Sequence, residues 1–83
     1  MVIKVLVVED DVTISKLFVE FLTKSGFETI TVVSAEAAQE ILSIEEMNIV
    51  VTDIVLPGMD GIQFTKNVRK KCNTDVIVMT GYS

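Results

Sequence analysis

The sequence predicts an α/β domain in which helices cover both faces of a parallel sheet. Three short apolar runs rich in β-branched residues, at 2–8, 49–52 and 76–79, have the composition of strands buried on both faces. Segments with helical spacing of apolar residues separate these runs, and a fourth strand pattern lies at 27–33. The resulting order, βαβαβαβ, is typical of a doubly wound sheet with right-handed crossovers.

The first helix is expected to follow the strand at 2–8. Five apolar residues recur at intervals of three and four and are expected to form one buried stripe: Ile14, Leu17, Phe18, Phe21 and Leu22. Asp11 can cap the start of this helix, and Gly26 supplies a stop shortly after Lys24. Polar and apolar residues alternate in 27–33, which indicates a strand with one wetter side or an edge position.

Two further helices are expected in the second half of the chain. Ser34 is the expected N-cap of one, with Glu36 in its first turn, where the helix dipole favours an acid. Its apolar side is expected to consist of four residues: Ala37, Ala38, Ile41 and Leu42. After a loop with one Pro and two Gly, the other helix is expected from about Ile62, packing Phe64 and Val68. It ends in three cations, which suit the negative end of a helix: Arg69, Lys70 and Lys71.

Length and composition set limits on the function. Eighty-three residues make at most one small domain, and 49% hydrophobic residues argue for a packed core. A net charge of −5 argues against nucleic-acid binding, which needs a basic face. No apolar run approaches the roughly 20 residues that span a bilayer, so no membrane association is expected. The lone Cys72 suits a reducing compartment, and residues 1–8 lack a signal-peptide layout. A cytoplasmic domain is expected.

Carboxylates stand where two of the apolar strand patterns end. Glu9 and Asp10 follow the first strand, and Asp53 follows the strand at 49–52. Parallel strands bring their carboxyl ends to one edge, in the crevice where such sheets bind ligands. At about 4 Å and an effective dielectric of about 20, each pair of carboxylates repels by roughly 4 kcal/mol, which a divalent cation relieves. Oxygen ligands favour Mg²⁺. A carboxylate beside such a cation can attack phosphorus, and the Thr80 hydroxyl is expected to reach a phosphoryl oxygen.

Each of these features also has a purely structural interpretation. The acids Glu9, Asp10 and Asp11 can act as helix caps and complement the helix dipole. Asp53 can be a turn acid before the Pro-Gly loop, and Thr80 an ordinary strand or turn residue. Cys72 has no indicated role. The three strand-end features together are far more specific than any one alone.

Three stretches of the chain resemble the receiver domain of two-component response regulators. They are Val5 to Asp11, Thr52 to Gly61, and Val78 to Ser83, and they occur in the order found in that family. The resemblance covers the entire chain. It implies a flavodoxin-like sheet with strand order 2-1-3-4.

The resemblance also implies roles for individual residues. Asp53 is similar to the phosphoacceptor, and Glu9 and Asp10 to the acidic pair that holds Mg²⁺. The carbonyl of Val55 matches the backbone ligand, and Thr80 matches the switch hydroxyl. The implied phosphoryl donor is a sensor histidine kinase or a phosphotransfer protein, and the implied role is signalling with at most weak self-phosphorylation and self-dephosphorylation.

A receiver domain normally continues beyond the fourth strand through a helix, a lysine-bearing strand and a final helix. Residues 1–83 are therefore expected to be the amino-terminal part of a single receiver domain. The strand at 76–79 would leave an exposed edge through which two copies can pair. The alternative function is a receiver remnant that acts as an interaction or dimerisation module without phosphorylation. A haloacid-dehalogenase-type phosphohydrolase fits poorly, because Glu9 stands where that family has its nucleophilic aspartate.

Overall fold

The computed structural model describes residues 2–53, 61–71 and 74–79 of the 83-residue chain. Strands and helices alternate along the described chain in the predicted order. The elements are β1 (Lys4–Val8), α1 (Val12–Lys24), β2 (Glu28–Val32), α2 (Ala35–Ile44), β3 (Ile49–Asp53), α3 (Gly61–Lys71) and β4 (Asp75–Met79). None of the helices in the described ranges is long and apolar enough to cross a membrane.

All four described strands are parallel and form one sheet in the order β2-β1-β3-β4. The predicted order 2-1-3-4 is therefore confirmed. Val8, the last residue of β1, pairs with Val32 of β2 on one side and with Thr52 of β3 on the other. The carboxyl ends of the strands consequently meet at one edge, as the fold class requires.

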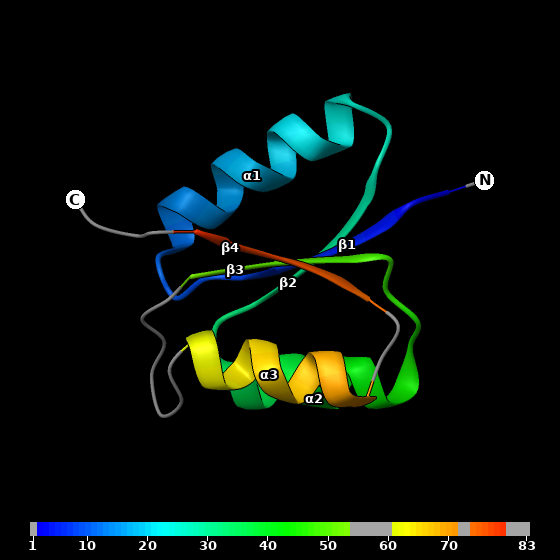
Figure 1. The fold of residues 1–83 in the computed structure, drawn as a ribbon. Coiled ribbons are helices and arrows are strands. Elements are labelled where there is room, and N and C mark those ends of the chain that lie inside the picture. The colour runs from blue at the N-terminus through cyan, green and yellow to red at the C-terminus, as the bar shows by residue number, and fades with distance from the viewer. Residues whose placement is uncertain (1, 54–60, 72–73, 80–83) are drawn as a thin grey trace.

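The helices are distributed unequally over the two faces of the sheet. Figure 1 shows α1 alone on one face and α2 with α3 on the other. Residues of β1 alternate between the faces: Leu6 and Val8 pack into the core under α2 and α3, whereas Val5 and Val7 face α1. The larger core on the two-helix face is filled from α3 by Phe64.

The predicted apolar stripe of α1 is only partly correct. Phe18 and Leu22 pack on the sheet, but Ile14, Leu17 and Phe21 are 41%, 63% and 69% exposed. The buried face of α1 is centred between Phe18 and Ser15, and helical periodicity puts the three exposed residues on one flank of it. The opposite flank lies against β2, so the exposed flank is on the side of β3 and β4. No element in the described ranges packs on it.

The helix caps were predicted correctly. The Asp11 carboxylate accepts hydrogen bonds from the backbone N–H groups of Thr13 (2.9 Å) and Ile14 (3.3 Å). The Ser34 hydroxyl accepts one from the Ala37 N–H (3.2 Å). Gly26 has φ +94°, a conformation that glycine adopts without strain.

The two outer strands of the described sheet differ from the buried pattern of β1 and β3. No residue of β2 is fully buried, as expected of an edge strand, but its burial does not alternate strictly: Glu28 and Thr31 are exposed and the three other residues are half-buried. β4 has the composition of a strand buried on both faces, yet its Ile77 is 53% and its Val78 36% exposed. The difference arises because β4 is the outermost described strand, with β3 on one side alone.

Candidate functional site

Three carboxylates meet at the carboxyl edge of the sheet. Glu9 and Asp10 follow directly after β1, and Asp53 is the last residue of the neighbouring strand β3. One carboxylate oxygen of each residue lies within 4.8 Å of the others. The Glu9 backbone N–H donates a 3.0 Å hydrogen bond to the Val32 carbonyl, so this residue is tied to β2 as well as to β1. The parallel register thus brings together the three acids that the sequence predicts.

The three acids differ in their exposure to water. Glu9 is only 3% exposed, Asp53 is half-buried and Asp10 is exposed. Burial raises the pKa of Glu9 to about 7, helped by the charge of Asp53 and by a hydrogen bond between the two side chains. Protonated Glu9 donates this bond to the Asp53 carboxylate. A hydrogen bond to the Asp11 backbone lowers the pKa of Glu9, and the nearby charge of Asp10 raises it.

The cluster has the chemistry of a site for a hard divalent cation. Its donor atoms are all carboxylate oxygens, the ligand type that Mg²⁺ and Ca²⁺ prefer. The raised pKa of Glu9 shows that its negative charge is not compensated by the protein alone. A cation in contact with Glu9, Asp10 and Asp53 would stabilise all three in their charged forms.

Three other residues were singled out in the sequence: Asp11, Val55 and Thr80. Asp11, the third acid of its run, serves as the cap of α1. Val55 and Thr80 lie outside the described residues, so the roles expected for the Val55 carbonyl and the Thr80 hydroxyl stay predictions. Beside Asp53, the fully buried Thr52 donates its hydroxyl to the Asp53 carbonyl at 3.1 Å.

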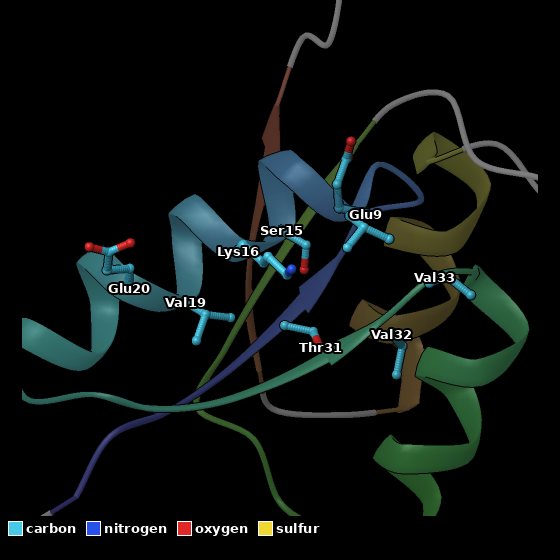
Figure 2. Close-up of a pocket in the computed structure, with 9 residues that line it drawn as sticks. Glu9, Ser15, Lys16, Val19, Glu20, Thr31, Val32 and Val33 are labelled. Carbon is cyan, nitrogen blue, oxygen red and sulfur yellow. The ribbon is translucent and has the colours of Figure 1, made fainter.

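The structure has a groove that the sequence did not predict. It starts at Glu9 of the acid cluster and runs between α1 and β2. Glu9 forms one end of the groove, and its carboxylate points out of it toward the end of β3 (Figure 2). The groove has a volume of about 480 Å³. One signal in the sequence pointed there: Ser15 lies on the sheet-facing side of α1, where an apolar residue is expected.

Residues 5–83 match the response regulator receiver domain family. The transcriptional regulatory protein YrkP of Bacillus subtilis (strain 168) is 32% identical over all 83 residues of this chain, which correspond to 36% of YrkP. PetR of Rhodobacter capsulatus is 36% identical over 75 residues, which make up 90% of this chain and 32% of PetR. The chain thus spans about a third of the length of these relatives.

Solved structures agree with this assignment. The MaeR response regulator bound to beryllium trifluoride matches with a TM-score of 0.88 at 31% identity, over 98% of this chain and 69% of MaeR. The chemotaxis response regulator CheY4 of Vibrio cholerae has the same fold, with a TM-score of 0.93 at 24% identity over 100% of this chain and 72% of CheY4.

The family match fits the parallel sheet and the acid cluster at its carboxyl edge. Receiver domains are modules of two-component signalling rather than enzymes of metabolism, and they work in general with a kinase. This chain belongs to the response regulator receiver domain family.

Proposed function

We propose that Asp53 accepts a phosphoryl group, with Mg²⁺ bound beside it, from a phosphohistidine of a sensor kinase or a phosphotransfer protein. The observation that carries this proposal is the convergence of Glu9, Asp10 and Asp53, whose carboxylate oxygens lie within 4.8 Å of one another. Such an arrangement of like charges destabilises a fold unless a proton, as on Glu9, or a cation offsets them.

Glu9, Asp10 and Asp53 would hold the cation, together with the backbone carbonyl of Val55. When bound, Mg²⁺ supplies positive charge that offsets the negative charge of the transferred group. Glu9 and Asp10 would bind the cation from the residues directly after β1. Asp53, the last residue of β3, would be the group that reacts.

In the proposed reaction a carboxylate oxygen of Asp53 attacks phosphorus. A bond forms between that oxygen and phosphorus, and the bond from phosphorus to the donor nitrogen breaks. The donor imidazole keeps the electron pair, and the product on this chain is an aspartyl phosphate. The Thr80 hydroxyl then donates a hydrogen bond to a phosphoryl oxygen. The reaction of Asp53 with small phosphoryl donors, and the hydrolysis of its product, would be slow.

A relative supports the proposal. MaeR, at 31% identity, was obtained with bound beryllium trifluoride, a group with the size and tetrahedral shape of a phosphoryl group on a carboxylate. Asp53, half-buried at the end of β3, has the access that such a group needs.

The test is the intact mass of the chain after incubation with acetyl phosphate and Mg²⁺. We expect the mass of one added phosphoryl group on the parent and none on Asp53→Asn. Asp75→Asn is the matched control, because Asp75 is an exposed aspartate at the start of β4, at the opposite edge of the sheet. It should be phosphorylated like the parent. An adduct that persists in Asp53→Asn, or none on the parent, would contradict the proposal.

A second candidate function is that of an interaction or dimerisation module. It is favoured by the exposure of Ile77 and Val78 on β4, an outermost strand whose backbone can pair with another chain. Pairing between two copies predicts an apparent mass that doubles with concentration. An unchanged monomeric mass over a wide dilution series would argue against it.

The extent of the domain is also part of the proposal. Because the chain spans 36% of YrkP and 72% of CheY4, we propose that residues 1–83 are the amino-terminal part of one receiver domain that continues through a helix, a strand and a further helix. Its acidic character and single Cys72 support a cytoplasmic location without contacts to nucleic acid or membranes.

A further inference from the structure

Thr52 is a polar residue at a place in the sheet that suits an apolar one. It comes directly before Asp53 on β3, is fully buried, and pairs with Val8 of β1, so both side chains lie on the face covered by α2 and α3. Val8 is fully buried too, so a valine fits this environment one strand away. Burying a hydroxyl costs free energy unless it forms a hydrogen bond. Packing alone therefore does not explain a threonine here.

The hydroxyl of Thr52 forms its hydrogen bond with Asp53. It donates to the backbone carbonyl of Asp53 at 3.1 Å. This bond closes a ring that runs from the Thr52 side chain through its Cα and the peptide bond to the Asp53 carbonyl. Because the peptide bond is planar, the ring restrains the backbone torsions on both sides of the Asp53 Cα. The direction in which the Asp53 side chain leaves the strand is thereby held.

Asp53 stands at a place where such a restraint has an effect. It is the last residue of β3 and pairs with β4 alone, because the pairing of β3 with β1 ends one residue earlier. Glu9, directly after β1, is held by the hydrogen bond from its N–H to the Val32 carbonyl. The hydroxyl of Thr52 gives Asp53 an additional attachment of its own, next to the cluster in which the carboxylate oxygens lie within 4.8 Å of one another.

We propose that Thr52 is a positioning residue for phosphoryl transfer to Asp53. This inference rests on the proposed function and adds to it a residue that touches neither the phosphoryl group nor the cation. Its hydroxyl keeps the Asp53 carboxylate beside Glu9 and Asp10. Without that bond the carboxylate spends less time where it can attack phosphorus and bind the cation, and a loss of orientation slows a group transfer.

The test compares two substitutions of Thr52. Thr52→Val removes the hydroxyl and nearly keeps the shape, whereas Thr52→Ser keeps the hydroxyl and removes a buried methyl group. Phosphorylation by acetyl phosphate is followed by intact mass at several Mg²⁺ concentrations, and each rate is divided by the folded fraction from urea unfolding. Thr52→Val should react about tenfold more slowly and need about threefold more Mg²⁺ for half its maximal rate.

Thr52→Ser should react within about twofold of the parent, although the lost methyl group lowers its urea midpoint. A purely structural role for Thr52 predicts instead that the rate follows stability in both variants. Thr29→Val is the matched control, because it removes a hydroxyl from β2 at a position that pairs with Val5, near the start of β1 and away from the acids. It should react like the parent.

The backbone of Asp53 provides a second measurement that needs neither Mg²⁺ nor a phosphoryl donor. Amide ¹⁵N relaxation should show Asp53 as ordered as Val50 and Val51 in the parent and in Thr52→Ser, and more mobile in Thr52→Val. If the parent is not phosphorylated but Asp53 becomes mobile in Thr52→Val alone, the proposed function fails and the hold of Thr52 on Asp53 is supported.

Three results would overturn the inference. The first is a Thr52→Val variant that reacts as fast as the parent at every Mg²⁺ concentration. The second is a Thr52→Ser variant as slow as Thr52→Val, since the hydroxyl would then not be the group that matters. The third is unchanged relaxation of Asp53 in Thr52→Val, which would show that the sheet holds Asp53 without this bond.

Discussion

The two faces of the sheet are covered to different extents. On the face of α2 and α3, Phe64 and Val68 close a core over Leu6 and Val8, and each of these four side chains is at most 2% exposed. On the opposite face α1 is the sole helix among the described elements, and its Leu17 is 63% exposed. Both faces of the sheet carry apolar side chains, and α1 has large apolar residues on its exposed flank as well as on its buried face. The difference therefore reflects how many elements pack there, not how hydrophobic the residues are.

The two faces of the sheet therefore have different roles. The two-helix face supplies most of the buried apolar area and hence most of the stability. The α1 face borders the chemistry, because α1 starts at the Asp11 cap, directly after Glu9 and Asp10. Stability should respond strongly to changes on the first face and weakly to changes on the exposed flank of the second.

The largest effect is expected for Phe64→Ala. Phe64 is fully buried in the two-helix core, and removing a buried Phe side chain costs about 3–5 kcal/mol. In a domain this small such a loss should unfold much of the population at room temperature. Urea unfolding followed by circular dichroism would measure it. A loss below about 1 kcal/mol would mean that the two-helix face is not the main source of stability.

The next largest effect is the pH dependence that Glu9 imposes. Its folded pKa of about 7 lies above the ordinary value of 4.5, so the folded state holds this proton more tightly than the unfolded state. The contribution of Glu9 to stability is therefore complete below about pH 4.5 and is lost as the pH rises to and past about 7. We expect the free energy of unfolding to fall by about 1–2 kcal/mol. This is less than the difference between the folded and unfolded pKa of Glu9 alone implies, because water around the exposed Asp10 screens the charges of the cluster.

Thermal unfolding at several pH values, with and without Mg²⁺, would measure this loss. Mg²⁺ should restore the lost stability at high pH, since a cation replaces the proton on Glu9. Glu9→Gln should remove the pH dependence in the range from about 4.5 to 7. A parent chain that becomes more stable over this range would contradict the assigned environment of Glu9.

Cap substitutions should have an intermediate effect and compare the two faces directly. Asp11 accepts two backbone hydrogen bonds at the start of α1, and Ser34 accepts one at the start of α2. Replacing either by Ala should cost about 1 kcal/mol, with the larger loss for Asp11→Ala. Equal or reversed losses in urea unfolding would show that the second hydrogen bond accepted by Asp11 adds nothing to the stability of α1.

The smallest effect is expected for Leu17→Lys on the exposed flank of α1. Leu17 contributes little buried area, and lysine is a comparable helix former, so stability should change by less than about 0.5 kcal/mol. Ile41→Lys is the matched substitution on the other face, because Ile41 packs against the two-helix core from α2, and it should be far more damaging. A large loss for Leu17→Lys would mean that the flank is covered in solution.

The order of the elements and the meeting of the acids followed from the sequence because they depend on local patterns, whereas the strand order 2-1-3-4 was implied by the resemblance to receiver domains. Buried strand runs, caps such as Ser34 and the rule for parallel strands are enough to bring Asp53 beside Glu9. The exposure of Leu17 and Ile77 did not follow, since periodicity reveals that a residue is apolar but not whether another element covers it. The raised pKa of Glu9 and the groove at Ser15 likewise depend on three-dimensional packing.

The proposed function requires Asp53 to be the carboxylate that takes the phosphoryl group. Borohydride reduces an aspartyl phosphate to homoserine, so treatment of the phosphorylated chain followed by tandem mass spectrometry locates the modified residue. We expect homoserine at position 53 and a dependence of the modification on Mg²⁺. Reduction at Glu9 or Asp10 instead, or modification that proceeds equally well without a divalent cation, would contradict it.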